Sequence, residues 1–151
     1  MQLTKDLREF IELLNSNGVE YLIVGAFAVA WYGYPRFTAD IDFFVRSTEA
    51  NADIVIAVLQ DFGFASLQIN RDDLNRPNRV VQLGAKPNRI DLITSIEGVD
   101  FEHAWVNRVL GTLDGIPVPF ISLEDLILNK ESTGRAKDKG DAEELRKRKF
   151  T

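Results

Sequence analysis

Hydrophobic residues recur along the chain with two different spacings, and each spacing predicts a type of element. Apolar positions three or four residues apart predict amphipathic helices, whereas short apolar runs predict strands. Helices are predicted over 4–17, 26–32, 49–62, 100–107, from 123 onwards and over 141–149. Strands are predicted over 21–24, 40–45, 64–69, 79–83, 89–94, 109–113 and 116–120.

Turn residues predict which strands pair. Asp114-Gly115 is the strongest two-residue hairpin signal, and Lys86-Pro87-Asn88 predicts a second hairpin. Pro117 and Pro119 place the second arm of the first hairpin at a sheet edge, or end its pairing, because proline has no N–H to donate.

Polar segments and a cap define the remaining boundaries. The stretches 70–78 and 130–139 are polar or charged and are predicted to be connections. Ser122 is expected to cap the helix that follows it, with Asp125 as its capping-box partner.

The mixture of hairpins and helices is typical of an α+β fold, in which helices pack on a mixed or mostly antiparallel sheet. The chain has 151 residues and shows no internal repeat, linker or low-complexity tract. Residues 1–151 are therefore predicted to form a single domain, with a helical segment at its C-terminal end.

Composition narrows the class of protein. Apolar residues make up 45% and charged residues 27%, as in globular proteins, and the net charge of −5 argues against coating nucleic acid by bulk charge. The absence of cysteine excludes disulfides and thiolate zinc sites. We see no targeting segment or membrane-length apolar run, so we expect a cytoplasmic protein without a membrane partner.

Most catalytic signatures are missing from the chain. It has no Walker loop, no G-x-G-x-x-G, no H-E-x-x-H and no G-x-S-x-G. His103 is the single histidine, which excludes a multi-histidine metal site. We expect His103 to be a structural or surface residue.

Asp40 and Asp42 stand in a strand-like run that is otherwise apolar. Side chains alternate along a strand, so both carboxylates point to the same face. Buried carboxylates repel each other, and a hard cation such as Mg²⁺ between them removes that cost. The alternative is a strand end, where both face water or pair with Arg36 or Arg46.

Asp91 lies in a second apolar run, from Arg89 to Ile93. If the two strands are neighbours, Asp91 completes a triad of carboxylates, and such a triad is hard to bury without a cation. The alternative is a surface ion pair between Asp91 and either Arg89 or Lys86.

Gly25 ends an apolar strand directly before a predicted helix. This arrangement presents free backbone N–H groups and the positive end of a helix, which suits an anion. Arg36 and Thr38 add a guanidinium and a hydroxyl just before Asp40. Alternatively, Gly25 only makes a tight turn, and Arg36 balances the nearby carboxylates.

In their order, these motifs resemble the nucleotidyltransferase superfamily typified by DNA polymerase beta. Its signature is Gly-Gly or Gly-Ser at a strand–helix turn, then an Asp-x-Asp or Asp-x-Glu strand, then a later strand Asp. Gly25-Ala26, Asp40-Ile41-Asp42 and Asp91 match those places, with Ala26 as a departure. The segment 130–141 resembles the K-x(4)-R-x-K-D-x-x-D region of small prokaryotic nucleotidyltransferase-like proteins, which include AbiEii-type toxins of toxin–antitoxin systems.

The resemblance implies a nucleotidyltransferase-like fold and transfer of a nucleoside monophosphate from a nucleoside triphosphate to a hydroxyl of RNA, protein or a small molecule. It implies that Asp40, Asp42 and Asp91 are catalytic and hold Mg²⁺ or Mn²⁺, and that an antitoxin protein is a partner. The nucleotide-binding residues that it implies are Gly25, Ala26, Arg36, Thr38, Lys130, Arg135 and Lys137. A solvated charged loop is the alternative interpretation of the last three.

Two other functions compete with this one. The first is a degenerate nucleotidyltransferase fold that binds a nucleotide or a partner without turnover. Ala26 and the short chain favour it, whereas the complete set of Asp40, Asp42 and Asp91 opposes it. The second is a metal-dependent phosphohydrolase that uses the same carboxylates and releases free phosphate instead of pyrophosphate.

Overall fold

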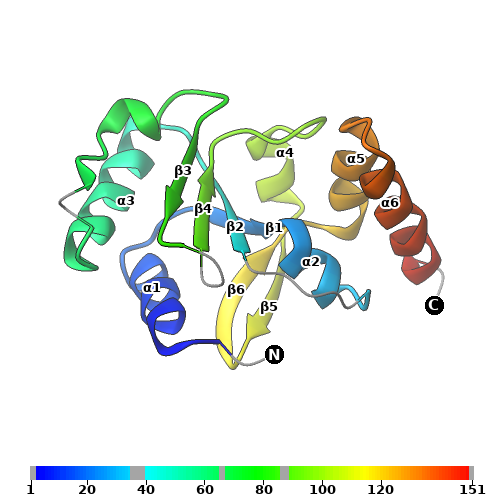
Figure 1. The fold of residues 1–151 in the computed structure, drawn as a ribbon, viewed down its shortest axis with the longest axis horizontal. Coiled ribbons are helices and arrows are strands. Elements are labelled where there is room, and N and C mark those ends of the chain that lie inside the picture. Colours follow the sequence, from blue (N-terminus) through cyan, green and yellow to red (C-terminus); the bar gives the residue numbers. More distant parts are fainter. Residues whose placement is uncertain (1–2, 35–39, 65–66, 86–88, 150–151) are drawn as a thin grey trace.

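The computed structural model describes residues 3–34, 40–64, 67–85 and 89–149 (Figure 1). The helices are α1 (Lys5–Ser16), α2 (Gly25–Trp31), α3 (Glu49–Asp61), α4 (Phe101–Val106), α5 (Leu123–Ser132) and α6 (Ala136–Lys149), with a 3₁₀ turn, η2 (Arg71–Asp73). The strands are β1 (Tyr21–Val24), β2 (Asp40–Val45), β3 (Val80–Leu83), β4 (Arg89–Ile93), β5 (Val109–Leu113) and β6 (Ile116–Phe120).

The six strands form one mixed sheet in the order β3-β4-β2-β1-β6-β5. The hairpins β3–β4 and β5–β6 are antiparallel, as is β1–β2, whereas β2–β4 and β1–β6 are parallel. In Figure 1, α1 and α3 lie on one side of the sheet and α2, α5 and α6 on the other. The predicted α+β class, with helices flanking a mixed sheet and a C-terminal helical segment, is confirmed.

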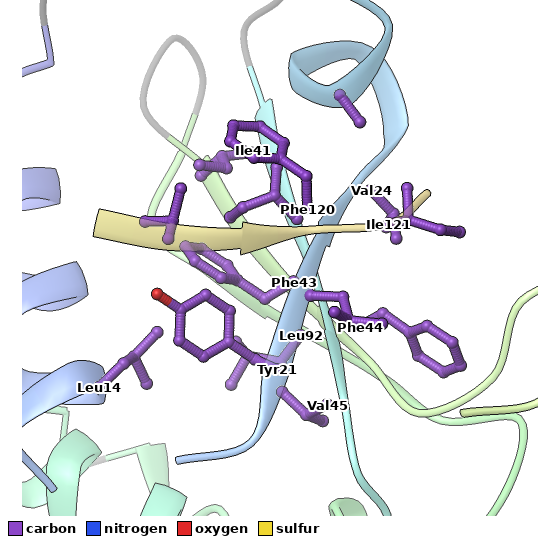
Figure 2. Packing of buried hydrophobic residues seen from close by; sticks show 14 of the residues in the cluster. Leu14, Tyr21, Val24, Ile41, Phe43, Phe44, Val45, Leu92, Phe120 and Ile121 are labelled. Atoms are coloured by element: carbon purple, nitrogen blue, oxygen red, sulfur yellow. The ribbon is translucent and has the colours of Figure 1, made fainter. Parts of the chain in front are cut away.

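The core lies between the central strands and the helix layers (Figure 2). Phe43 of β2 makes edge-to-face contacts with Phe10 of α1 and Tyr21 of β1, with ring centroids 5.6 and 5.5 Å apart. Trp31 of α2 stacks on Phe120 of β6 at 3.9 Å. Such aromatic pairs add directional contacts to burial, so they fix how the helices sit on the strands.

The prolines of β6 do not put this strand at a sheet edge. β6 pairs with β5 over its full length, and its pairing with β1 is confined to the register Ile23–Phe120, just past Pro119. The other predicted alternative was that the prolines end the pairing of β6. This holds on the side of β6 that faces β1, because Pro117 and Pro119 have no N–H to donate there. The edge strand is β5 instead.

Two element predictions were wrong. The described residues of 64–69 form no strand, and Gln68 has a φ of 54°. The stretch 130–139 is largely helical, because α5 continues to Ser132 and α6 begins at Ala136. Lys130 and Arg135 pair with the buried Asp138, whereas Lys137 and Lys139 are exposed as a charged helix surface allows, so charge alone misled the prediction. The turn at 86–88 lies outside the described residues.

The capping prediction for α5 holds in part. The Ser122 hydroxyl accepts a hydrogen bond from the backbone N–H of Asp125. The Asp125 carboxylate does not complete a capping box; it lies 3.1 Å from Nε2 of His103, whose side chain is mostly exposed. Within the described ranges, none of the helices combines the length and hydrophobicity that crossing a membrane requires.

Candidate active site

The three predicted carboxylates come together on β2 and β4. These strands are parallel neighbours, with Asp42 opposite Asp91 and Asp40 opposite Arg89. On the other side of β2, Val24 at the end of β1 lies opposite Asp42. The strand adjacency on which the triad depended is therefore present, and it lies where β1 turns into α2.

Arg89 joins two of the three carboxylates. Its Nη2 donates to Oδ2 of Asp40 at 2.7 Å, and its Nε donates to Oδ1 of Asp91 at 3.0 Å. The hydrogen bond with Asp91 raises the pKa of the Arg89 guanidinium. Asp91 therefore forms the ion pair with Arg89, but it is buried and not at the surface as that alternative required, whereas Arg46 pairs with Glu20 and Glu102.

We call the cluster of Asp40, Asp42 and Asp91 the carboxylate floor. Within this floor, Asp42 is the carboxyl whose ionisation is least favourable. The pKa of its carboxyl is raised to about 7, most of all by burial, then by charge repulsion from Asp91, a hydrogen bond with Asp91 and charge repulsion from Asp40, while Lys130 lowers it. A neighbouring cation would favour the ionised form of this carboxyl.

Gly25 makes room for Asp42. A Cβ at Gly25 would lie 2.1 Å from Oδ2 of Asp42, and the residue has a φ of 68°, which glycine adopts at little cost. Position 25 therefore needs glycine for two reasons: the Asp42 carboxylate lies too close for a side chain, and the backbone has a positive φ.

A pocket of about 340 Å³ opens above this floor. Asp42 and Gly25 line its base, and Lys130, Thr133 and Arg135 line the wall formed by α5 and the turn into α6. The pocket is further lined by Val24, Asn78, Ile93, Ser95, Ile96, Glu97, Gly98, Asn129 and Asp138. One cavity thus has Asp42 at its base and cations on its wall, whereas Asp40 and Asp91 are not among the residues that line it.

Asp138 organises the cationic wall. Its carboxylate accepts hydrogen bonds from Lys130 Nζ at 3.2 Å, from the Thr133 hydroxyl at 2.7 Å and from Arg135 Nε at 2.7 Å. Burial opposes its ionisation, but these bonds outweigh burial and lower its pKa. Asp141 adds a second carboxylate 3.5 Å from Lys130 Nζ. Both aspartates are buried, so they hold the cations in place from behind.

Of the remaining predicted site residues, two are described but do not line the pocket, and two lie outside the described residues. Ala26 follows Gly25 at the start of α2 but does not line the pocket, and Lys137 is exposed away from it. Arg36 and Thr38 lie outside the described residues.

Two residues that organise the site had no assigned functional role in the sequence analysis: Arg89, considered only as an ion-pair partner, and Asp138. The alternation Arg89-Ile90-Asp91 carried a signal for the first, since residues two apart share a face of a strand.

The donor set fits a hard divalent cation by its chemistry, because three carboxylates supply only oxygen ligands. The raised pKa of Asp42 also indicates a place where positive charge is favourable. Across the ranges that the structure describes, however, no three Asp, Glu or His side chains are arranged to hold a metal ion. The Arg89 guanidinium instead holds Asp40 and Asp91.

Comparison with known families agrees with this geometry. Residues 3–149 match the model of a family described as nucleotidyl transferases of unknown function (DUF2204). The chain belongs to this family. The match covers both the carboxylate floor and the cationic wall. A search of curated proteins gave no match.

Solved structures share the fold of this family member. The lincosamide antibiotic adenylyltransferase LnuA, in a lincomycin-bound crystal structure, is 16% identical with a TM-score of 0.56, over 95% of this chain and 96% of the other. A predicted nucleotidyltransferase from Thermotoga maritima is 17% identical with a TM-score of 0.56, over 93% of this chain and 88% of the other. These likenesses extend over nearly the whole chain and confirm the nucleotidyltransferase fold.

Proposed function

We propose that this chain transfers a nucleoside monophosphate from a nucleoside triphosphate to a hydroxyl group of an acceptor, with Mg²⁺ or Mn²⁺ as cofactor. The observation that carries the proposal is one pocket with Asp42 at its base and Lys130 and Arg135 on its wall. A negative base suits a metal cation, and a positive wall suits the phosphates that the cation accompanies. Family membership supports the reaction class.

Each charged group has a role in this reaction. Asp40, Asp42 and Asp91 would hold the metal, which when bound would neutralise the triphosphate and polarise the phosphorus under attack. Asp91 would help to activate the acceptor hydroxyl. The acceptor oxygen bonds to the α-phosphorus as the bond to the bridging oxygen breaks. Lys130 and Arg135 would bind the pyrophosphate that leaves.

The nucleotide is proposed to run from the cationic wall to the β1–α2 turn. The turn at Gly25 and Ala26, together with Arg36 and Thr38, would contact phosphate oxygens, as the superfamily resemblance implies. Lys137 contributes less, because its exposed side chain lies away from the pocket lining.

Calorimetry with the four ribonucleoside triphosphates, with and without Mg²⁺, tests the site. Wild type is expected to bind one of them in the presence of Mg²⁺, and the Asp40→Ala/Asp42→Ala double variant is expected to lose that binding. Pyrophosphate release together with a labelled acceptor then identifies transfer, whereas free phosphate identifies a phosphohydrolase. A folded wild type that binds none of the four contradicts the proposal.

A degenerate fold that binds without turnover is the second candidate, and Arg89 is the observation that favours it. Its guanidinium holds two of the three proposed metal ligands. Titration of Mn²⁺, followed by electron paramagnetic resonance, separates the candidates. If the site is functional, wild type binds Mn²⁺ and Asp42→Ala does not. If Arg89 replaces the metal permanently, wild type binds none, whereas Arg89→Ala does.

The acceptor and the cellular role are finer parts of the proposal. LnuA is an antibiotic adenylyltransferase, so small hydroxyl compounds should be tested beside RNA and protein. The resemblance to AbiEii-type toxins supports a toxin role with an antitoxin partner in the cytoplasm. Expression of the chain alone should then slow growth, and Asp42→Ala should restore it. Harmless expression of active wild type would contradict the toxin role but not the transfer reaction.

A further inference from the structure

β5 is the last strand at one end of the sheet, and its outer edge is apolar. Leu110 is 76% exposed, Val109 is 38% exposed, and Val106 just before the strand is 75% exposed. These are three of the six large hydrophobic residues that are exposed in the described part of the chain. Their concentration within five positions at one edge marks an interaction surface.

The backbone of β5 offers hydrogen bonds on the same side. Leu110 lies opposite Pro119 and Thr112 lies opposite Pro117 in the β5–β6 register. Because proline has no N–H, the hydrogen-bonded pairs with β6 are the alternate ones, which begin at Val109. The N–H and C=O groups of Leu110 and Thr112 therefore point away from β6, toward the open edge.

The usual protection of an edge strand is missing from β5. Residues 109–113 contain no lysine, no glutamate and no proline, which are the residues that discourage pairing between edges. Gly111 adds no side chain at the centre of the strand, and the space beside it is filled by Trp31. Among the described residues no strand pairs with this outer edge, so β5 offers it to a further strand.

Charge at the two ends of β5 identifies the strand that fits. In an antiparallel pair of two β5 strands centred on Gly111, Leu110 lies opposite Thr112 of the second copy. The same register places Arg108 opposite Asp114 of the second copy, and Asp114 opposite Arg108 of the second copy. Arg108 is held at the start of the strand by Trp105, with its guanidinium 4.0 Å from the ring centre. The Asp114 carboxylate also accepts a hydrogen bond from the backbone N–H of Leu3 and pairs with Arg8 at 3.0 Å, and its main-chain carbonyl accepts a hydrogen bond from Arg8.

We propose that β5 pairs antiparallel with β5 of a second copy of this chain, which joins two six-stranded sheets into one across a two-fold axis. Such an interface is self-complementary. When two copies of this apolar strand pair antiparallel, the cation at the start of each lies opposite the anion at the end of the other. The proposal does not depend on the reaction proposed above, because neither strand end lines the pocket.

Sedimentation velocity of the full chain over a range of concentrations tests this interface. Wild type is expected to form dimers, and Leu110→Lys is expected to weaken the dimer at least about tenfold, because two lysines would be placed at the paired edge. The matched control is Val80→Lys on β3, the strand at the opposite end of the sheet, where Val80 is 58% exposed. Val80→Lys is expected to leave the dimer unchanged.

Thr112→Pro provides a second variant that leaves the apolar surface intact. It removes an outward N–H without touching the hydrogen bonds to β6, so it should weaken the dimer while circular dichroism stays unchanged. A wild type that stays monomeric at all concentrations overturns the proposal. So does a dimer that survives both folded β5 variants, or one that Val80→Lys dissociates while Leu110→Lys does not.

Discussion

Asp42 and Asp138 are both acidic side chains that line the same pocket, yet their protonation equilibria shift in opposite directions. Burial raises the pKa of Asp42 to about 7, helped by Asp91 and Asp40. Burial acts on Asp138 as well, but hydrogen bonds from Thr133, Lys130 and Arg135 outweigh it and lower the pKa. The two sites differ in the number of positive donors around each carboxylate.

This difference assigns the two halves of the pocket different tasks. On β2 and β4, three carboxylates lie near one guanidinium, which pairs with Asp40 and Asp91, so the floor has an excess of negative charge. Between α5 and α6, Asp138 is surrounded by cations and a hydroxyl, so the wall is a pre-assembled set of donors. The floor favours an added positive charge, which suits the metal of a metal–triphosphate complex. The wall presents positive donors, which suit its phosphates.

The largest effect is expected when a carboxylate of the floor is neutralised. Asp42→Asn keeps the side-chain shape but removes the charge, so nucleotidyl transfer should fall at least about a thousandfold. Pyrophosphate release measures it. Asp72→Asn is the control, because Asp72 is exposed on η2 and pairs only at the surface with Arg76. Equal activity of Asp42→Asn and wild type would mean that the floor is not catalytic.

The next largest effect breaks the wall. Asp138→Asn removes the charge that holds Lys130 and Arg135, and it should lower the free energy of unfolding by about 3 kcal/mol, because cations lose a buried partner. Urea denaturation measures the change, and Asp72→Asn should cost less than about 1 kcal/mol. If both variants cost the same, Asp138 does not organise the wall.

A pH series sharpens the contrast at Asp42. Its raised pKa means that the folded chain binds a proton more tightly than the unfolded chain between the ordinary aspartate pKa and about 7. Stability from this group is therefore present at low pH and is lost as the pH rises through about 7. In EDTA at pH 8, Asp42→Asn should raise the melting temperature by about 5 °C, and the gain should shrink toward pH 4. A gain that does not depend on pH would exclude this explanation.

The smallest expected effect compares a cation of the wall with a neighbouring cation that does not line the pocket. Arg135 lines the pocket and is held by Asp138, whereas Lys137, two residues later, is exposed away from it. Arg135→Ala should weaken Mg²⁺–nucleotide binding by about three- to tenfold, and Lys137→Ala should leave it unchanged. Calorimetry measures both. Equal losses would indicate a diffuse charge effect.

Much of the fold follows from local pattern. The 3.6-residue period of α1, the apolar run of β2 and the Asp114-Gly115 turn each predict an element that the structure contains. The two errors lie where local pattern is a poor guide. Residues 130–139 have the composition of a solvated loop, and only the approach of α6 to α5 brings Asp138 to Lys130.

The resemblance of the sequence motifs to nucleotidyltransferases indicated the family and the proposed reaction class. The sequence by itself determined that Asp40 and Asp42 share one face of a strand, because side chains two residues apart point the same way. The tertiary structure decided how their charge is balanced. Arg89 reaches Asp40 only because β2 and β4 are adjacent and in register, and Asp138 reaches Lys130 only because α6 packs on α5. The physical reason is that Coulomb and hydrogen-bond energies depend on distances across the fold, which spacing along the chain does not specify.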